Sequence, residues 1–184
     1  MKNPPDTIPR IHPRNAVKFV LVTLLLAASA LAQQKPAALP AACGPKKASF
    51  DVQLDKSQHL QAQPETGKAR VYFIQNLGPL NFIGVINVGL DGAWVGANKN
   101  NSYFSVSVMP GEHHVCEKVK SHIFVYGQLV ELSNFTAQAG GIYYFRARLV
   151  EGENSPFLFL DPVGSDEGKY LVATYPLSVS HPKK

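Results

Sequence analysis

The sequence predicts an all-β fold, a mainly antiparallel β-sandwich with one short C-terminal helix. From Lys68 onward, short runs alternate between apolar and polar residues, as strands with one buried face do. Turn residues rich in Gly, Pro and Asn separate these runs at short intervals, which is typical of a sandwich or barrel. The sequence shows no long amphipathic helix, no heptad pattern and no internal repeat. These three observations together favour the β-sandwich.

The expected strands follow one another along the chain. In KARVYFIQN (68–76), Ala69, Val71 and Phe73 share one face, because side chains alternate along a strand. The other expected strands are enriched in β-branched or aromatic residues and lie at 49–55, 82–90, 93–97, 102–109, 113–116, 122–132, 134–139 and 141–151. A helix is expected over EGKYLVAT (167–174), with Ser165 and Asp166 as caps and Pro176 beyond its end.

Two dipeptides predict tight turns. Asp91-Gly92 is a strong hairpin signal, since glycine accepts positive φ without steric cost. Pro110-Gly111 suits the two central positions of a type II turn, and the alternating runs on either side predict a second hairpin there. Gly140-Gly141 is expected at the entry to the strand that follows it.

Residues 1–32 have the pattern of a signal peptide. A positive segment precedes the 13-residue apolar run FVLVTLLLAASAL, which ends at the small-x-small triplet 30–32 that signal peptidase accepts. A membrane span needs about 20 apolar residues, so we expect cleavage after Ala32 and no span in the mature chain. An uncleaved anchor is the alternative. The long Pro-rich start leaves two start sites open, Met1 and a position near Val17.

The remaining chain divides into three segments. Residues 33–48 are rich in Ala, Pro and Lys without periodicity and are expected to form a linker. Residues 49–180 carry the strand pattern and form the predicted β-sandwich domain, and 181–184 form a tail.

The charge of the whole chain overstates how basic the mature protein is. The net charge is +5, but residues 1–32 hold four of the 18 Lys and Arg residues and one of the 13 Asp and Glu residues. The rest therefore carries 14 basic against 12 acidic groups. This balance argues against a nucleic-acid partner.

The two cysteines, Cys43 and Cys116, predict a disulfide. An export signal places them in an oxidising compartment, where disulfides persist. Two free buried thiols are one alternative. Lipidation of Cys43 within LPAAC is another, although Pro40 stands where a lipobox has an aliphatic residue.

The stretch MPGEHHVC (109–116) concentrates residues that could bind a metal or catalyse a reaction. On a strand, however, His113 and His114 point to opposite faces, so they cannot both bind one metal without distortion. His114 and His122 could meet across strands as weak metal ligands, but a third ligand is not apparent, and a disulfide would remove Cys116 as a thiolate. A turn followed by a strand is the favoured interpretation. No Gly-x-Ser-x-Gly elbow and no phosphate-binding loop is present.

Aromatic and arginine side chains predict a binding surface. Arg146 and Arg148 share one strand face with Tyr144, and Tyr72 is a further candidate for partial exposure. Aromatic residues and arginine are enriched at binding hot spots. Ordinary packing of the sheet faces is the alternative.

Three segments carry a family resemblance: GKARVYFIQ, VGLDGAWVGANKNNSYFSVSVMPGEHHVC and AQAGGIYYFRARL. Their order over about Phe50 to Ser178 resembles the bacterial domain-of-unknown-function 2846 family. The V-x-x-D-G…PGEH element also resembles PEGA-type surface-associated modules. The resemblance implies an exported, β-rich bacterial domain, in a family whose members are often described as lipoproteins. It implies no activity and no catalytic residues.

These observations predict a non-enzymatic binding or structural domain of the cell envelope, periplasmic or secreted and without a cofactor. Another envelope protein or a cell-wall component is the expected kind of partner. The alternative is a metal-binding or hydrolytic enzyme using His113, His114 or His122. A third possibility is a structural envelope component anchored by lipid through Cys43 or by an uncleaved leader.

Overall fold

The computed structural model describes residues 42–45, 48–57, 62–77, 84–120, 129–150, 152–153 and 156–183. They belong to one compact unit, Pro40–Lys184. The predicted leader and most of the predicted linker lie outside the described residues. Within the described part of the chain, no helix has the length and apolar character needed to cross a bilayer.

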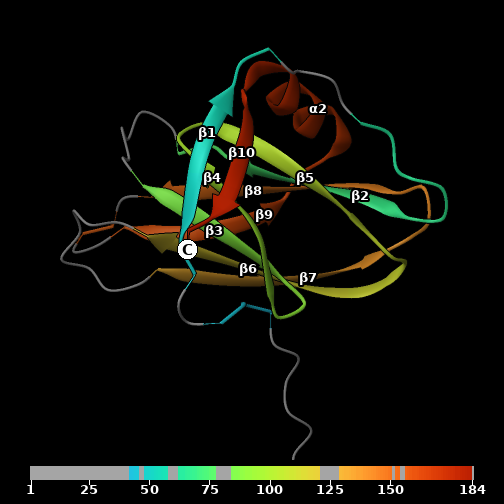
Figure 1. The fold of residues 1–184 in the computed structure, drawn as a ribbon, viewed down its shortest axis with the longest axis horizontal. Helices are drawn as coiled ribbons and strands as arrows, with labels where there is room; N and C mark the ends of the chain where they lie inside the picture. Colours follow the sequence, from blue (N-terminus) through green and yellow to red (C-terminus); the bar gives the residue numbers. More distant parts are fainter. Residues whose placement is uncertain are drawn as a thin grey trace, which may run out of the picture. The chain divides into compact units, whose positions relative to one another are not determined.

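The described strands form two sheets, as the predicted sandwich requires (Figure 1). The six-stranded sheet has the order β1-β10-β5-β2-β8-β9. Its strands are β1 (Phe50–Asp55), β2 (Ala69–Gln75), β5 (Ser102–Val108), β8 (Ile142–Val150), β9 (Phe157–Pro162) and β10 (Leu177–Pro182). Most neighbours are antiparallel, but β2 pairs with β8, and β10 with β5, in parallel. The all-β prediction is therefore confirmed.

The four-stranded sheet has the order β4-β3-β6-β7 and is antiparallel throughout. Its strands are β3 (Val85–Leu90), β4 (Ala93–Lys99), β6 (Gly111–Lys120) and β7 (Val130–Ala137). Asp91 and Gly92 join β3 to β4 with φ of 50° and 83°. Positive φ at both central residues is what a tight hairpin turn of the I′ type requires, so the hairpin predicted at Asp91-Gly92 is confirmed.

The main core lies between the two sheets and follows the predicted alternation. Ala69, Val71 and Phe73 of β2 pack with Phe145 of β8 and Val115 of β6 in one buried cluster. A second cluster, which includes Ile86, Val119 and Ala147, lies further along the same strands. Because each strand presents alternate residues inward, the sequence pattern grouped Ala69, Val71 and Phe73 on one face, and Phe145 and Ala147 on another, but it did not identify Val119.

The helix α2 (Ser165–Thr174) covers part of the outer face of the six-stranded sheet. Leu171 and Val172 pack on tyrosines of β2, β5 and β8. The helix was predicted, but its cap was not: Gly164 occupies the N-cap position, without a side-chain hydrogen bond, and Ser165 is already helical. The helix ends before Pro176, as expected.

The prediction of a hairpin at Pro110-Gly111 is wrong. The strands on either side, β5 and β6, belong to different sheets, so this turn carries the chain across the sandwich. Gly111 has φ of 139° and is already the first residue of β6, paired with Ala137 of β7. Local turn chemistry fixes a reversal of the chain, but it does not say which sheet receives the next strand.

One other expectation needs correction, and two strands were missed. The strand β7 (Val130–Ala137) runs without a break through the boundary expected between strands at 122–132 and 134–139; residues 121–128 lie outside the described part. The strands β9 and β10 were not predicted, since both are short and contain a proline at their last position.

Candidate functional site

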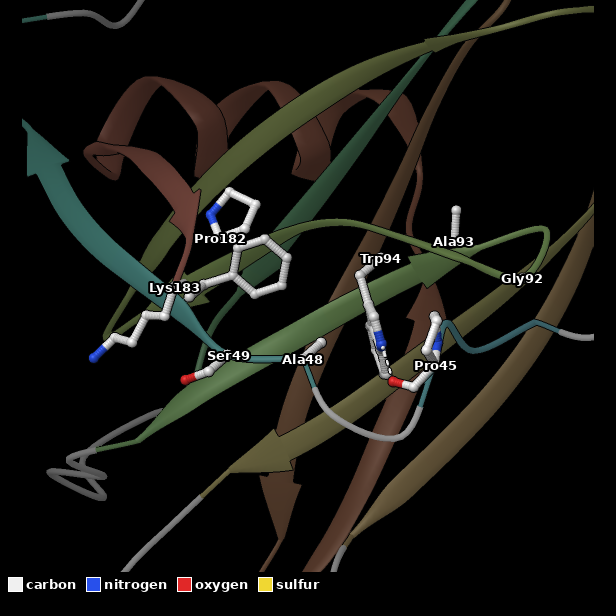
Figure 2. A pocket seen from close by; sticks show the side chains of 9 residues that line it. Pro45, Ala48, Ser49, Gly92, Ala93, Trp94, Pro182 and Lys183 are labelled. Carbon is white, nitrogen blue, oxygen red and sulfur yellow. Dashed lines mark hydrogen bonds between the residues drawn. The ribbon is translucent and has the colours of Figure 1, made fainter.

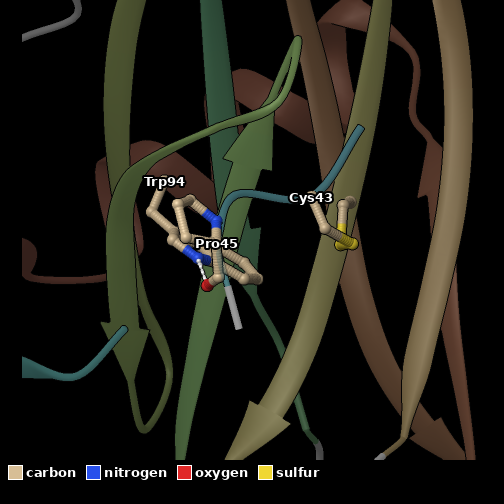
Figure 3. The surroundings of a disulfide bond; sticks show 4 residues. Cys43, Pro45 and Trp94 are labelled. Carbon is tan, nitrogen blue, oxygen red and sulfur yellow. Dashed lines mark hydrogen bonds between the residues drawn. A yellow bond between two sulfur atoms is a disulfide. The ribbon is translucent and has the colours of Figure 1, made fainter. Parts of the chain in front are cut away.

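A short segment before the first strand, Ala42–Pro45, is fastened to the outer face of the four-stranded sheet. Trp94 of β4, Gly89 of β3 and Cys116 of β6 lie in one row across this face, because Gly89 is paired with both of the others. Cys43 forms the predicted disulfide with Cys116, and their Cα atoms lie 5.0 Å apart. The disulfide prediction is therefore confirmed, and it anchors one end of the segment (Figure 3).

Trp94 holds the other end of the segment. Its indole Nε1–H donates to the carbonyl oxygen of Pro45 at 2.7 Å. Just before Cys43, the carbonyl oxygen of Ala42 accepts a hydrogen bond from the backbone N–H of Gly92 at 3.3 Å. The segment is thus attached to three positions of the sheet.

Small residues let this segment lie close to the sheet. A Cβ atom on Gly89 would lie 2.8 Å from the carbonyl oxygen of Ala42 and 3.1 Å from Cα of Cys43. A Cβ atom on Gly44 would lie 2.4 Å from the Trp94 ring. Since real Cβ atoms do not make such contacts, both glycines are required for the backbone to reach the disulfide.

A pocket of about 450 Å³ opens beside this segment (Figure 2). Its lining comes from the segment, the start of β1, the β3–β4 turn and the end of β10: Pro45, Ala48, Ser49, Phe50, Gly92, Ala93, Trp94, Pro182 and Lys183. Figure 2 shows Pro45 on one side of the half-buried Trp94 ring and Pro182 on the other. The volume is within the range of small-molecule sites, about 300–1,000 Å³.

The histidines of MPGEHHVC take structural roles. Nδ1 of His113 lies 2.7 Å from Oδ2 of Asp91, and Nε2 lies 2.7 Å from the carbonyl oxygen of Met109. Both partners are acceptors only, so both ring nitrogens must donate and His113 is an imidazolium. The backbone N–H of His114 donates to the other oxygen of Asp91 at 2.8 Å. This cluster ties the β3–β4 turn to the β5–β6 crossover.

His113 and Asp91 each shift the pKa of the other in the direction that favours its charged form. Burial acts to lower the pKa of His113, but its hydrogen bonds to Asp91 and Met109 outweigh burial and raise the pKa above the ordinary value. Burial acts to raise the pKa of Asp91, but hydrogen bonds from the backbone of His114 and the ring of His113 lower it. Each charge therefore stabilises the other.

The residues proposed as metal ligands are not brought together. His114 lies 3.9 Å from Glu112, and His122 lies outside the described residues. Cys116 is bonded to Cys43. Among the described residues, no group of three or more His, Cys, Asp and Glu side chains is placed to hold a metal ion.

Comparison with known proteins identifies the family. A sequence model of the family described as "Protein of unknown function (DUF2846)" matches residues 65–159, just over half of the chain. The chain belongs to the DUF2846 family. No curated protein matches it. The match spans Trp94 and Cys116 but neither Cys43 nor Pro182, so the DUF2846 domain proper supplies only one side of the pocket. The resemblance to PEGA-type modules stays a prediction.

The binding surface predicted on this DUF2846 domain is wrong for its two tyrosines. Tyr72 and Tyr144 are 1% and 3% exposed and stack on each other with ring centroids 5.2 Å apart. They lie beneath α2, where a Cβ atom on Gly168 would lie only 2.2 Å from the Tyr144 ring. The helix was expected, but the sequence did not show which sheet face it covers.

The two arginines of that surface are partly exposed but already paired. Arg146 forms ion pairs with Glu167 of α2 and with Asp161 of β9. Nε and Nη2 of Arg148 each lie 2.6 Å from Oδ2 of Asp161. The guanidinium of Arg148 also lies over the ring of Phe159, 5.6 Å from its centroid. Their charges are therefore largely satisfied within the domain.

Sequence reasoning missed the exposed aromatic residues of β9. Phe157 and Phe159 are 55% and 40% exposed, next to Val150 and Arg148 of β8. The alternation in FLFL, with Leu158 and Leu160 buried, was the available signal.

Sequence reasoning also missed an acid in the core. Glu117 of β6 is fully buried between the two sheets, and neither carboxylate oxygen has a hydrogen-bond partner among the described residues. Burial and the nearby charge of Glu131 raise its pKa to about 8. Two further inward polar residues, Gln75 and Asn98, are buried with at least one unpartnered atom within the described structure.

Proposed function

We propose that this chain is an exported, non-enzymatic binding or structural domain of the bacterial cell envelope. The observation that carries the proposal is the Cys43–Cys116 disulfide, which joins residues 73 positions apart. Such bonds persist in oxidising compartments and are rare where thiols are kept reduced. The signal-like leader at 1–32 supports the same location. The sulfur of Cys43 cannot form a disulfide and carry a lipid thioether at once, which favours release over lipid anchoring.

The arrangement of polar groups supports a binding role over the enzymatic alternative. Both ring nitrogens of His113 are engaged by Asp91 and Met109, so a metal or a substrate would have to displace two hydrogen bonds. The ring of His114 lies 3.9 Å from the carboxylate of Glu112, and its backbone N–H is bound to Asp91. The pocket at Trp94 instead presents ring surfaces, which suit binding.

The test is the mass of the mature protein. The full chain is expressed in a bacterium with a periplasm, fractionated, and weighed intact before and after reduction and alkylation. We expect a periplasmic or secreted species that begins at Gln33 and takes up two alkyl groups only after reduction. A Cys43→Ser variant is the control, and we expect it to take up one alkyl group without reduction.

Two outcomes would contradict the proposal. A species that begins at a lipid-modified Cys43 would make the protein a membrane-tethered one, with Cys116 as a lone thiol. A full-length cytoplasmic species whose two thiols react without reduction would remove the case for export.

A further inference from the structure

The two halves of the Cys43–Cys116 disulfide differ in their access to solvent. Cys116 is fully buried in β6, whereas Cys43 is half-buried in the segment Ala42–Pro45, on the outer face of the four-stranded sheet (Figure 3). A thiolate breaks a disulfide by attacking one of its two sulfur atoms, and the rate depends on which sulfur it can reach. A thiol that approaches from solvent therefore reaches Cys43 first.

The strand around Cys116 suits a thiolate. Residues two apart on a strand share a face, so Lys118 lies on the face of Cys116, with the two Cα atoms about 6.7 Å apart. His114 shares this face on the other side of Cys116, but Glu112 lies 3.9 Å from its ring and offsets any charge that the ring carries. The positive charge near Cys116 therefore comes from Lys118. A nearby positive charge stabilises a thiolate, which makes Cys116 a good leaving group.

The segment Ala42–Pro45 depends on the disulfide for its place on the sheet. The other contacts described for it are its two hydrogen bonds, with the indole of Trp94 and the backbone of Gly92, and its packing on the Trp94 ring. Water can replace the partners of hydrogen bonds at a protein surface, so their net contribution is small. Fixing four residues costs conformational entropy, which these contacts do not offset on their own. Without the disulfide, the segment leaves the sheet.

The chain that follows the segment is held independently of the disulfide. The side-chain amide of Asn87 donates to the carbonyl oxygen of Ala48 at 3.4 Å, and the backbone N–H of Lys183 donates to the carbonyl oxygen of Ser49 at 2.7 Å. The strand β1 begins at the next residue and pairs with β10 over its whole length. Cleavage of the disulfide therefore frees the segment and leaves the sandwich in place.

We infer that Cys43 is a thiol-exchange site, at which a small-molecule thiol cleaves the disulfide and releases the segment Ala42–Pro45 from the sheet. The thiolate attacks Sγ of Cys43 and forms a mixed disulfide with it, while the bond between the two protein sulfur atoms breaks. The electron pair of that bond goes to Sγ of Cys116, which takes a proton from water. The small thiol is thereby oxidised into the mixed disulfide, and Cys116 is reduced to a thiol.

The inference goes beyond the export and binding role proposed above, because it assigns a chemical reaction to one residue. It also gives the reaction a structural result. Release of the segment uncovers Cys116, Gly89 and the Trp94 ring, which lie in one row across the sheet.

The test uses reduced glutathione as the small thiol and the purified chain with its disulfide intact. Samples taken over time are quenched with N-ethylmaleimide, digested without reduction and analysed by mass spectrometry. We expect glutathione on Cys43 and the maleimide on Cys116, at least about ten times as often as the reverse arrangement, because only Cys43 is accessible.

The fluorescence of Trp94 reports whether the segment has left the sheet, since Trp94 is the only tryptophan in the chain. We expect its emission to move to longer wavelength as the mixed disulfide forms. The reference is the Cys43→Ser/Cys116→Ser double variant, in which the segment has no covalent link to β6, and the two emission spectra are expected to agree. Far-ultraviolet circular dichroism is expected to show that the sheets persist in both.

A matched pair of lysine variants tests the role of charge. Lys118→Gln removes the positive charge near Cys116, and we expect it to slow exchange about threefold or more. Lys169→Gln makes the same change at an exposed position of α2, which covers the other sheet, and we expect it to leave the rate unchanged.

Four results would overturn the inference: glutathione found equally on both cysteines, exchange that occurs only in urea-unfolded protein, Trp94 emission that stays unchanged while the mixed disulfide forms, or equal exchange rates in the two lysine variants. None of them would affect the mass and location measurements that test export, so the two proposals fail separately.

Discussion

His113 and Glu117 lie four residues apart on the same face of β6, yet their surroundings are opposite. His113 sits near the start of the strand, where the β3–β4 turn and the β5–β6 crossover meet, and two acceptors bind its ring. Glu117 sits in the middle of the strand, opposite Val88 of β3 and Glu131 of β7, without a hydrogen-bond partner among the described residues.

The difference shows that the position of a buried ionisable group along a strand decides how much free energy its charged form costs. At the end of a strand, turns bring backbone carbonyls and turn carboxylates within reach, so a charge can be paired. In the middle of a strand, the neighbouring backbone groups are already used in the sheet, and only side chains can respond. Glu117 therefore stays neutral at pH 7, with its pKa raised to about 8, whereas the two acceptors bound to the His113 ring favour its charged form.

The largest effect is expected from Glu117→Gln. Between pH 4.5 and about 8 the unfolded chain ionises at this position while the folded chain does not, so the free energy of unfolding falls as pH rises. The full shift from 4.5 to about 8 corresponds to a loss on the order of 5 kcal/mol. Glutamine keeps the shape and polarity but cannot ionise, so the variant escapes this loss.

Urea unfolding of both proteins from pH 4 to pH 9 measures the difference. We expect nearly equal free energies of unfolding at pH 4 and a gap in favour of the variant that widens up to about pH 8. Parallel curves across the whole range would show that Glu117 ionises equally in both states, and the description of Glu117 as a neutral core acid would be abandoned.

Sequence alone could predict half of this comparison. The alternation that places His113 and Val115 on one face also places Glu117 there, so its inward position was available from the spacing. The pairing of His113 with Asp91 was not, because it depends on β6 lying beside β3, while Pro110-Gly111 predicted a hairpin with the preceding strand. A contact between residues that a crossover brings together can be predicted only when the order of the strands in each sheet is known.

The pocket and the buried tyrosines also depend on contacts between segments that are far apart in the sequence. The disulfide could be predicted because the chain has two cysteines, which leave one intramolecular pairing. The ring walls around Trp94 come from segments far apart in sequence, Pro45 and Pro182 among them, so no local pattern indicated them. Tyr72 and Tyr144 alternate as surface residues do, but α2 covers them, and the sequence does not say where a helix docks.

A smaller effect is expected from His113→Leu, which keeps packing against Phe135 but removes both hydrogen bonds. The pKa of His113 is raised by folding, so its contribution is present below pH 6.5 and is lost as pH rises through the raised pKa. We expect the variant to lose about 1–2 kcal/mol of stability at pH 6 and less at pH 9.

Asp91→Asn is the matched partner in a double-mutant cycle, since asparagine tolerates the positive φ at this turn. The pKa of Asp91 is lowered, so its charge contributes above pH 3.8 and the pair is complete only between the two shifted values. A coupling energy of zero at pH 6 would mean that the ion pair contributes nothing to stability.

The smallest effect is expected from Glu131→Gln, which alters the surroundings of Glu117 without touching it. Burial is the larger cause of the raised pKa of Glu117, and the charge of Glu131 is the smaller one. Removing that charge lowers the pKa by a fraction of what desolvation imposes, so Glu117 remains neutral at pH 7. A carbon-detected NMR titration of the Glu117 carboxyl measures the shift directly. If the pKa of Glu117 fell to its ordinary value in this variant, the charge of Glu131, and not burial in the apolar interior, would be the main cause of the raised pKa.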